Sequence, residues 1–313
     1  MINILITGAN GFIGTNLVNK LKEKPDVNII CLVRTENLKI KDNFENVKYK
    51  CVDYSNNDLI KKIVIEQDIN IVYHLAWSSN PEIALKNTEN DIISNVIPSI
   101  NLINSCIGTN VKNFIFISSG GTIYGNSRTY PIKETNLQEP ISAYGVGKLS
   151  IERYLKMYNH LYDFNYVIFR PSNPYGPFQN LYKNQGVISI FLYRALLKEK
   201  ITIWGDGRII RDYFYIDDMI SALISALNFN SQKQKVFNLG GVKGYSLNDL
   251  IEIIEKSLNT NVKISYEQDR QYDADKIILD SSLAKKHLNW TPRISLEEGV
   301  SLTAKWLKNK FDL

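Results

Sequence analysis

Ile2-Asn3-Ile4-Leu5-Ile6-Thr7, followed at once by Gly8-Ala9-Asn10-Gly11-Phe12-Ile13-Gly14, is the stretch of sequence that decides the fold. A largely apolar run of this length is typical of a parallel strand covered on both faces. Gly8 permits a tight turn, Gly11 lets the backbone approach a pyrophosphate, and Gly14 lets the next helix pack on the strand. The start of that helix presents free N–H groups that attract phosphate. The order of strand, turn and helix therefore predicts a dinucleotide site, with a ligand-free turn as the alternative. The residues assigned to it are Gly8, Asn10, Gly11, Phe12, Ile13 and Gly14.

Strand and helix patterns alternate through the first half of the chain. Further strands are predicted at Val27–Val33, Val47–Val52, Ile71–Ala76, Asn113–Ser118 and Tyr166–Arg170. Helices are predicted at Gly11–Glu23, Asn57–Glu66, Asn87–Cys106 and Tyr144–His160. This alternation predicts an α/β fold with a doubly wound parallel sheet and helices on both faces. Ligands bind such sheets beyond the carboxyl ends of the strands, which adds Leu75 and Ala76 to the cofactor candidates.

The pattern changes after Arg170, where Pro171, Pro174 and Pro177 form a rigid loop and the later elements become shorter. We expect a dinucleotide-binding domain over residues 1–170 and a smaller α/β substrate-binding lobe over residues 171–313. Residues 212–240 are expected to return to the first domain, so the boundary is not a single cut in the sequence.

Composition narrows the functional classes. The 313 residues are 44% hydrophobic and 22% charged, with a formal net charge of +5 and no long block of one sign. We therefore expect no nucleic-acid partner and no membrane partner. Cys31, Cys51 and Cys106 lack metal-ligand spacing, so no metal site is expected and the thiols are interpreted as free. With no transmembrane stretch and an N-terminus that begins a strand, we expect a cytoplasmic protein.

Tyr144 and Lys148 stand four residues apart at the start of a predicted helix, on one face. An ammonium near a phenol favours the phenolate, so we expect Lys148 to lower the pKa of Tyr144 and make it an acid/base group. The same lysine could reach the ribose of a nicotinamide. A second pair with this spacing, Tyr272 and Lys276, lies in a polar segment. Position alone separates the two pairs, because only Tyr144 follows the fifth strand.

A run of small residues closes the fifth strand, from Ser118 to Gly125. A hydroxyl of Ser118, Ser119 or Thr122 could share a hydrogen bond with the substrate oxygen that Tyr144 deprotonates. The alternative is a serine and glycine turn that only ends the strand. Together with the glycine-rich turn and the Tyr144–Lys148 pair, the run predicts a catalytic site.

With these motifs the chain resembles the extended short-chain dehydrogenase/reductase family, in its nucleotide-sugar epimerase/dehydratase branch. The resemblance covers essentially the whole chain. It also rests on Arg170-Pro171-Ser172-Asn173-Pro174-Tyr175-Gly176-Pro177 and on Trp204-Gly205-Asp206-Gly207 leading to Arg211-Asp212-Tyr213. It implies a Rossmann-like fold, NAD or NADP as cofactor, and a nucleotide-diphosphate sugar as substrate.

The resemblance also implies roles for single residues. Tyr144 would be the acid/base and Lys148 its partner, which also contacts the cofactor. Ser119, Asn173, Gln185, Gly186 and Val187 would contact the substrate. Arg211 and Arg270 would clamp its diphosphate, a task that suits the planar guanidinium. Asp53 would lie near the adenine, and Asn95 would lie on a helix behind Tyr144.

The residues before Tyr124 bear on the reaction. Dehydratases of this family carry an Asp-Glu pair there and decarboxylases a Glu, whereas this chain has Gly120, Gly121 and Thr122. The resemblance then implies hydride transfer at C4, and we expect a UDP-hexose 4-epimerase of surface polysaccharide biosynthesis. The alternative is an NADPH-dependent 4-ketoreductase or 4-dehydrogenase of a dTDP-, CDP- or GDP-linked sugar. A non-catalytic dinucleotide-binding module is a remote third.

Two positions depart from the epimerase pattern. UDP-galactose epimerases commonly have a serine where this chain has Gly120, so Ser119 or Thr122 would have to supply the hydroxyl. Arg34 ends the second strand where NAD enzymes usually carry an acidic residue, and an arginine there suits the 2′-phosphate of NADP. Glu36 could still reach the ribose, so the choice between NAD and NADP stays open.

The predicted helices Asn87–Cys106 and Tyr144–His160 carry apolar residues on more than one face. In related enzymes these helices pair with their copies, so we expect a homodimer. A single core-facing stripe on each helix is the alternative.

Overall fold

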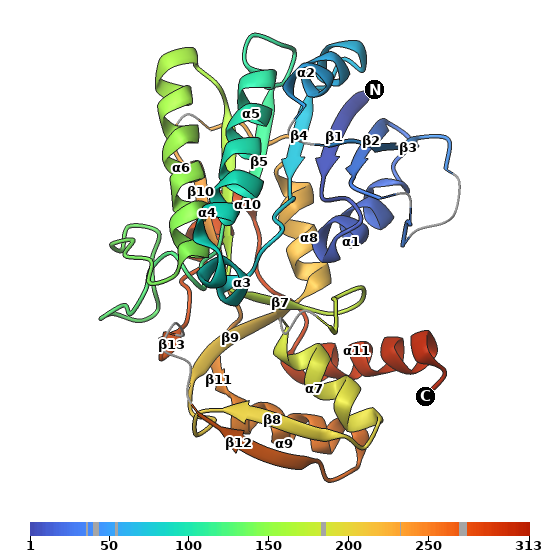
Figure 1. The fold of residues 1–313 in the computed structure, drawn as a ribbon, viewed down its shortest axis with the longest axis vertical. Helices are drawn as coiled ribbons and strands as arrows, with labels where there is room; N and C mark the ends of the chain where they lie inside the picture. Colours follow the sequence, from blue (N-terminus) through green and yellow to red (C-terminus); the bar gives the residue numbers. More distant parts are fainter. Residues whose placement is uncertain (36, 40–43, 54–55, 183–185, 232, 269–273) are drawn as a thin grey trace.

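The computed structural model describes residues 1–35, 37–39, 44–53, 56–182, 186–231, 233–268 and 274–313. Its large sheet has seven parallel strands in the order β10-β6-β5-β4-β1-β2-β3 (Figure 1). They are β1 Ile2–Thr7, β2 Val27–Val33, β3 Val47–Cys51, β4 Ile71–His74, β5 Asn113–Ile117, β6 Tyr166–Pro171 and β10 Val236–Leu239. The predicted doubly wound α/β fold is confirmed.

Helices cover both faces of this sheet (Figure 1). One face carries α1 Phe12–Leu21 and α8 Ile216–Ser225, and the other carries α2 Asn57–Glu66, α5 Ile97–Cys106 and α6 Ala143–Tyr162. The alternation of β1 explains both cores. Ile4 and Ile6 pack with the α1 side, whereas Leu5 packs with the α2 side. The continuous apolar run is therefore needed because both faces of β1 are buried.

The helix predicted over Asn87–Cys106 is divided in the structure. It consists of α4 Thr88–Asp91, the π-helical turn η1 Ile92–Val96, and α5, while the short helix α3 Pro81–Lys86 precedes it. Pro98 lies in the first turn of α5 and has no N–H to donate back along the helix. The wider π-turn thus stands directly before the residue that interrupts the hydrogen-bond ladder.

The smaller lobe lies beyond one edge of the large domain (Figure 1). In it β9 Ile210–Tyr215 pairs with β7 Asn173–Tyr175, β11 Gly244–Ser246 and β13 Lys276–Ile277, and β8 Lys200–Trp204 pairs with β12 Lys263–Glu267. Its helices are α7 Val187–Leu196, α9 Leu247–Leu258 and α11 Leu296–Phe311.

The chain passes between the lobe and the large sheet more than once. After β9, helix α8 packs on α1 and β10 joins the sheet beside β6. Helix α10 Ser282–Leu288 then packs near β10. The division of the chain into domains at residue 170, with residues 212–240 returning, stays a prediction. No helix in the described part of the chain is long and apolar enough to cross a membrane.

A buried ion pair joins α6 to β6. Arg170 Nη2 lies 2.6 Å from Glu152 Oε2, and both side chains are almost completely buried. Arg170 Nη1 also donates to the Tyr124 hydroxyl at 2.8 Å, and Tyr124 donates to Asn238 at 2.7 Å. These bonds tie the loop after β5 to β6, α6 and β10. The two charges offset each other's loss of water only while both are present.

We expect Glu152→Gln to lower the free energy of unfolding by about 3–5 kcal/mol, because it leaves the Arg170 guanidinium buried without its counter-charge. Denaturant unfolding measures the change. The matched control is Glu66→Gln, which breaks the exposed Lys62–Glu66 pair and is expected to cost less than about 1 kcal/mol. Equal costs for the two variants would contradict the role of the buried pair.

Candidate active site

A cavity of about 1030 Å³ opens at the carboxyl ends of the strands and extends to α7, β8 and β9 of the lobe. Of the predicted site residues that the structure describes, all but Asp53 line it. Gln185 and Arg270 lie outside the described residues, as does Glu36. The cavity thus has one wall from the large sheet and another from the lobe, and it lies beyond the carboxyl ends of the strands, where doubly wound sheets bind ligands.

The glycine-rich turn is packed too tightly for side chains. Gly8 has a φ of +70°, and a Cβ there would lie 2.8 Å from the backbone nitrogen of Ala76. A Cβ on Gly14 would lie 2.2 Å from the carbonyl oxygen of Gly8. Gly11 is the N-cap of α1 and places no side chain over the free N–H groups of that helix. The turn therefore fits a diphosphate, which those N–H groups would bind.

Around the end of β2 the predictions have different outcomes. Arg34 lines the cavity. Asn10 lines it too, but its side chain also bonds the loop after β2, donating to Asn37 O and accepting from Lys39 N, both at 2.8 Å. Asp53 is exposed and is absent from the lining. Its place near the adenine stays a prediction.

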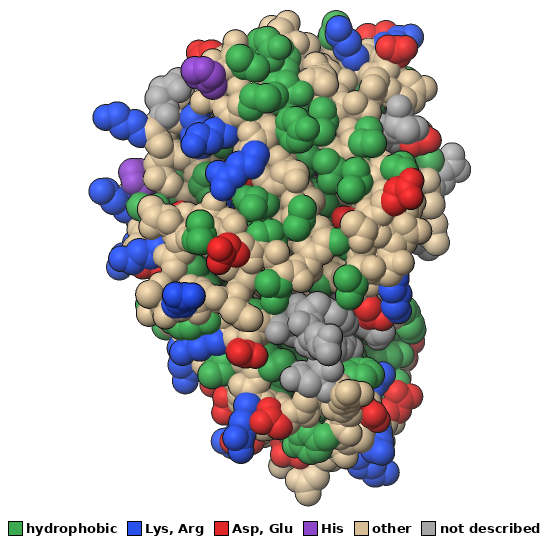
Figure 2. Space-filling model, turned by 60° about the vertical axis from the view of Figure 1, so that its left-hand side comes forward, with side chains coloured by type: hydrophobic (Ala, Val, Ile, Leu, Met, Phe, Trp, Pro, Cys, Tyr) green, Lys and Arg blue, Asp and Glu red, His purple; other side chains and the backbone are tan. Residues whose placement is uncertain are grey.

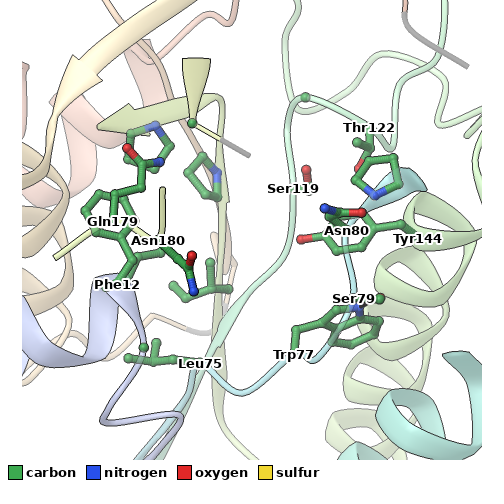
Figure 3. A pocket seen from close by; sticks show the side chains of 18 of the residues that line it. Phe12, Leu75, Trp77, Ser79, Asn80, Ser119, Thr122, Tyr144, Gln179 and Asn180 are labelled. Carbon is green, nitrogen blue, oxygen red and sulfur yellow. Dashed lines mark hydrogen bonds between the residues drawn. The ribbon is translucent and has the colours of Figure 1, made fainter. Parts of the chain in front are cut away.

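Helix α6 brings Tyr144 and Lys148 to the cavity. Ser142 caps the helix by accepting from Gly145 N, so the pair lies in its first two turns. The Lys148 ammonium is buried, donates to Ile117 O at 2.8 Å, and lies 5.7 Å from the centre of the Tyr144 ring. In Figure 3 the Tyr144 side chain points into the cavity, on the same side as Ser119 and Thr122.

Trp77 is a site residue that the sequence analysis missed. Its ring lies 3.9 Å beneath the Lys148 ammonium and meets the Tyr144 ring edge-on, with 5.9 Å between ring centres. The residue follows β4, and its position three residues beyond the strand end was the only available signal. Cations are attracted to the face of an indole ring at this distance.

The charges of the site correct one expectation. Burial lowers the pKa of Lys148 to about 7, although the nearby carboxylates Asp91 and Glu152 oppose the shift. Burial and then the charge of Asp91 raise the pKa of Tyr144 above its ordinary value. The expectation that Lys148 lowers the phenol pKa is wrong for these side chains alone. The loss of water around the phenol outweighs the effect of an ammonium that is itself held at Ile117.

The run after β5 contributes hydroxyls to the cavity. Ser118 Oγ and Thr122 Oγ1 are buried with no hydrogen-bond partner in the described part of the protein. Ser119 lines the cavity beside them. Buried hydroxyls that lack a partner and line a cavity fit a polar ligand. All three residues therefore remain candidates for contact with a substrate oxygen.

Gly120 and Gly121 face different surroundings. A Cβ on Gly120 would lie 2.8 Å from Arg170 O and 2.4 Å from the Leu279 side chain, and Gly120 is absent from the cavity lining. A serine here would point away from the cavity. Gly121 lines the cavity, and a Cβ there would have its nearest neighbours at 3.9 Å. The structure thus leaves space in front of position 121.

Buried polar side chains build the loop that follows β4. Asn95, in η1, donates to Asp91 Oδ1 at 2.8 Å and accepts from Ser78 N at 2.7 Å. Asp91 also accepts from the Ser79 hydroxyl. Asn95 was expected behind Tyr144, and its bonds in the structure hold the loop that carries Trp77. A π-turn at such a position is common near functional sites.

His74 is a buried neutral side chain beneath this loop. Its ring nitrogens share hydrogen bonds with Thr7 Oγ1 at 2.8 Å and Ser99 Oγ at 2.7 Å. Burial, helped by the charge of Lys148, lowers the pKa of His74 to about 3. The imidazole therefore joins β1 to α5 without carrying charge.

The lobe side of the cavity contains the predicted substrate residues. Asn173 donates to Asp212 O at 3.1 Å, and Gly186 precedes α7 with a φ of +95°. Val187 and Arg211 line the same wall. Gln179 and Asn180, which were not predicted, lie across the cavity from Tyr144 (Figure 3).

Comparison with known proteins agrees with this geometry. The profile described as the NAD dependent epimerase/dehydratase family matches residues 4–240. The chain belongs to this family. Its members are described as NAD dependent, and the glycine-rich turn of this chain fits a nicotinamide dinucleotide, so the predicted cofactor class is confirmed.

Three similar proteins span nearly the full chain. It is 35% identical to a putative UDP-glucose 4-epimerase of Methanocaldococcus jannaschii and 32% identical to a dTDP-4-dehydro-6-deoxyglucose reductase of Escherichia coli, in each case over 98% of both chains. A UDP-glucose 4-epimerase of Thermotoga maritima, solved with UDP-glucose, superposes with a TM-score of 0.93 at 34% identity and covers 99% of each chain. The predicted family is confirmed, and relatives named as an epimerase and as a reductase both occur among these proteins.

Within the described residues, no group of three or more His, Cys, Asp and Glu side chains is arranged to hold a metal ion. The polar side chains that line the cavity carry hydroxyls, amides, phenols, indoles, an imidazole and basic groups, together with the Glu82 carboxylate. Such a set suits phosphates and sugar hydroxyls.

The buried lysine predicts a pH dependence of stability. An unfolded lysine holds its proton up to about pH 10.5, whereas burial lowers the pKa of Lys148 to about 7. Between these values unfolding takes up a proton, so raising the pH stabilises the folded state. Relative to Lys148→Met, the parent is expected to gain up to about 1.4 kcal/mol per pH unit between pH 7 and 9. Denaturant titrations measure the gain, and parallel curves for the two proteins would contradict it.

Proposed function

We propose that the protein is a nucleotide-sugar 4-epimerase that acts on a UDP-hexose. The observation that carries the proposal is the arrangement of Tyr144 beside Lys148, facing the hydroxyl-bearing run Ser118–Thr122 across one cavity wall. A phenol within reach of a sugar hydroxyl can exchange its proton, and a neighbouring hydroxyl can orient the same oxygen. The relatives named as UDP-glucose 4-epimerases support the choice of substrate.

Each part of the cavity has a task in this proposal. The glycine-rich turn and the start of α1 would hold the dinucleotide diphosphate, and Arg211 would hold the diphosphate of the sugar nucleotide. A bound nicotinamide dinucleotide would supply a hydride acceptor and donor and, when oxidised, a positive charge. Tyr144 would take the C4 hydroxyl proton and return it after the hydride has been replaced on the other face. Lys148 would stabilise the phenolate.

A 4-ketoreductase is the second candidate function. Arg34 lines the cavity at the end of β2, where a guanidinium would bind the 2′-phosphate of NADP. The Escherichia coli relative named as a reductase supports the hypothesis of a 4-ketoreductase. In that case NADPH would supply the hydride to a 4-keto sugar, and Tyr144 would donate the proton.

The first experiment incubates the purified protein with UDP-glucose or UDP-galactose, without added cofactor. Epimerisation predicts interconversion of the two hexoses, because the hydride returns to the sugar and retained cofactor is regenerated. Tyr144→Phe is expected to lower the rate at least about 100-fold, since it removes the group that transfers the proton. The control Tyr266→Phe alters an exposed tyrosine outside the cavity lining and is expected to leave the rate within about twofold.

Other outcomes of this assay contradict the proposal. Strict dependence on NADPH and a 4-keto sugar would establish the reductase instead. Equal rates for Tyr144→Phe and the parent would remove Tyr144 from catalysis. A protein that binds dinucleotide but converts neither class of sugar would be a binding module.

We propose a homodimer formed through one side of the large domain. Hydrophobic side chains gather on that side, where α5 and α6 lie (Figure 2). The exposed apolar residues of η1, α5 and α6 include Ile92, Ile93, Ile97, Val146, Met157 and Leu161. An exposed patch on adjacent helices favours pairing with a second copy.

Light scattering coupled to gel filtration tests the dimer. The parent is expected at twice the mass of the chain, and Leu161→Glu is expected to shift it toward the monomer by placing a charge in the interface. Val242→Glu alters an even more exposed apolar residue elsewhere and is expected to leave the mass unchanged. A parent at monomer mass would overturn the proposal.

We place the enzyme in the cytoplasm, supplying sugar nucleotides for surface polysaccharides. Cys31, Cys51 and Cys106 are all free thiols, which supports a reducing compartment.

A further inference from the structure

One aromatic ring contacts both members of the Tyr144–Lys148 pair. The Trp77 indole presents its face to the Lys148 ammonium at 3.9 Å and makes a T-shaped contact with the Tyr144 ring. Phe116 is the next ring, with its centre 5.0 Å from the ammonium. Lys148 therefore has the Ile117 carbonyl on one side and the indole face on another, away from bulk water.

The indole is held in this orientation by its own hydrogen bond. Trp77 Nε1 donates to Ser79 Oγ at 3.1 Å, and Ser79 donates in turn to the Asp91 carboxylate. Asn95 fixes the same loop through Ser78. The ring position is thus set by polar contacts from α4 and η1, not by apolar packing alone.

Helix α6 has a glycine where the ring needs room. A Cβ on Gly147 would lie 3.1 Å from Cζ2 of Trp77 and 3.4 Å from Asp91 Oδ2. Glycine inside a helix costs about 1 kcal/mol relative to alanine. The glycine directly before Lys148 therefore allows the close approach of the indole to the ammonium.

A buried ammonium keeps its proton only if its surroundings replace water. The titratable groups that face Lys148 are Asp91 of α4, Tyr144 and Glu152 of α6, and His74 of β4. His74 is neutral, and neither carboxylate lies within 4 Å of the ammonium among the ion pairs of the described residues. The indole face is thus the nearest group, besides the Ile117 carbonyl, that attracts the positive charge.

We propose that Trp77 is a positioning residue for the reaction, and that its indole face holds the Lys148 ammonium charged and oriented beside Tyr144. The inference rests on the proposed function, because it concerns the ammonium that stabilises the phenolate and reaches the cofactor ribose. Trp77 itself exchanges no proton with the substrate.

The decisive pair of variants is Trp77→Leu, which removes the π face, and Trp77→Phe, which keeps an aromatic face. Near neutral pH, Trp77→Leu is expected to lower kcat for C4 conversion about tenfold with KM within about threefold. In the plot of kcat against pH, the alkaline limb of Trp77→Leu should move about one unit to lower pH, because Lys148 then loses its proton at a lower pH. Trp77→Phe should stay within about threefold of the parent with the limb in place. An unshifted limb in Trp77→Leu, or an equal loss in Trp77→Phe, would overturn the proposal.

Fluorinated tryptophan gives a test that needs no change of shape. Fluorine withdraws charge from the π face, so increasing fluorination should move the alkaline limb stepwise to lower pH. The chain has four tryptophans. Incorporating fluorinated tryptophan into the Trp77→Phe variant therefore measures the combined effect of the other three. Equal shifts in the two backgrounds would exclude Trp77. This measurement decides the question even where Trp77→Leu fails to fold.

Cofactor binding separates this inference from the proposed function. The Kd of NADH is measured by its fluorescence from pH 6 to 9 in Trp77→Leu and Trp77→Phe. Binding should weaken at a lower pH in Trp77→Leu, because the charge that reaches the ribose is lost earlier. Coinciding curves would overturn the role of Trp77. Failure to convert UDP-hexoses, by contrast, would overturn the proposed function and leave this binding test valid.

Discussion

The constraint on which the site depends is an ammonium kept away from water at the end of β5. Lys148 cannot occupy that place without replacements for its hydration, and the structure supplies them from separate segments: the Ile117 carbonyl from β5, the Trp77 face from the loop after β4, and more distant charges from α4 and α6. Tyr144 is carried on the same helix, so fixing the lysine also fixes the phenol. The contacts that stabilise the charge of Lys148 therefore also set the position of Tyr144.

The buried Arg170–Glu152 ion pair connects helix α6, and with it Tyr144 and Lys148, to the rest of the fold. It holds α6 on β6, and through Tyr124 it holds the loop that brings the Ser118–Thr122 hydroxyls to the cavity. The lobe contributes the opposite wall of the cavity. The chain that leaves the lobe strand β9 forms α8 and later β10, which pack on α1 and pair with β6, so the lobe is connected to the large domain at several points. The two walls are thus built from one continuous set of contacts.

Much of the fold could be predicted from the sequence because its signals are local. The apolar run of β1 and the glycines after it report burial on both faces and close backbone approach, and each is visible within a dozen residues. The Tyr144–Lys148 pair was predicted in the same way, since the two residues share one helix face, and the structure places both at the cavity. The alternation of strand and helix likewise predicted the parallel sheet with helices on both faces.

The parts that could not be predicted depend on contacts between distant segments. Trp77 gains its meaning only when α6 lies over the loop after β4, and nothing near it in the sequence marks it as a partner of Lys148. The direction of the Tyr144 pKa depends on burial, which the four-residue spacing does not report. The orientation of Gly120 toward Leu279 likewise requires the position of a segment more than 150 residues away.

A side chain at position 147 and the indole of Trp77 would compete for the same space, because a Cβ on Gly147 would lie 3.1 Å from Cζ2 of Trp77. A descendant of this chain that gains even a methyl group at position 147 needs the indole to move by a few tenths of an ångström. A smaller residue at position 77, by contrast, creates no clash while position 147 is still glycine. The two positions are therefore expected to change together, and a change at position 77 opens the space that a side chain at position 147 would use.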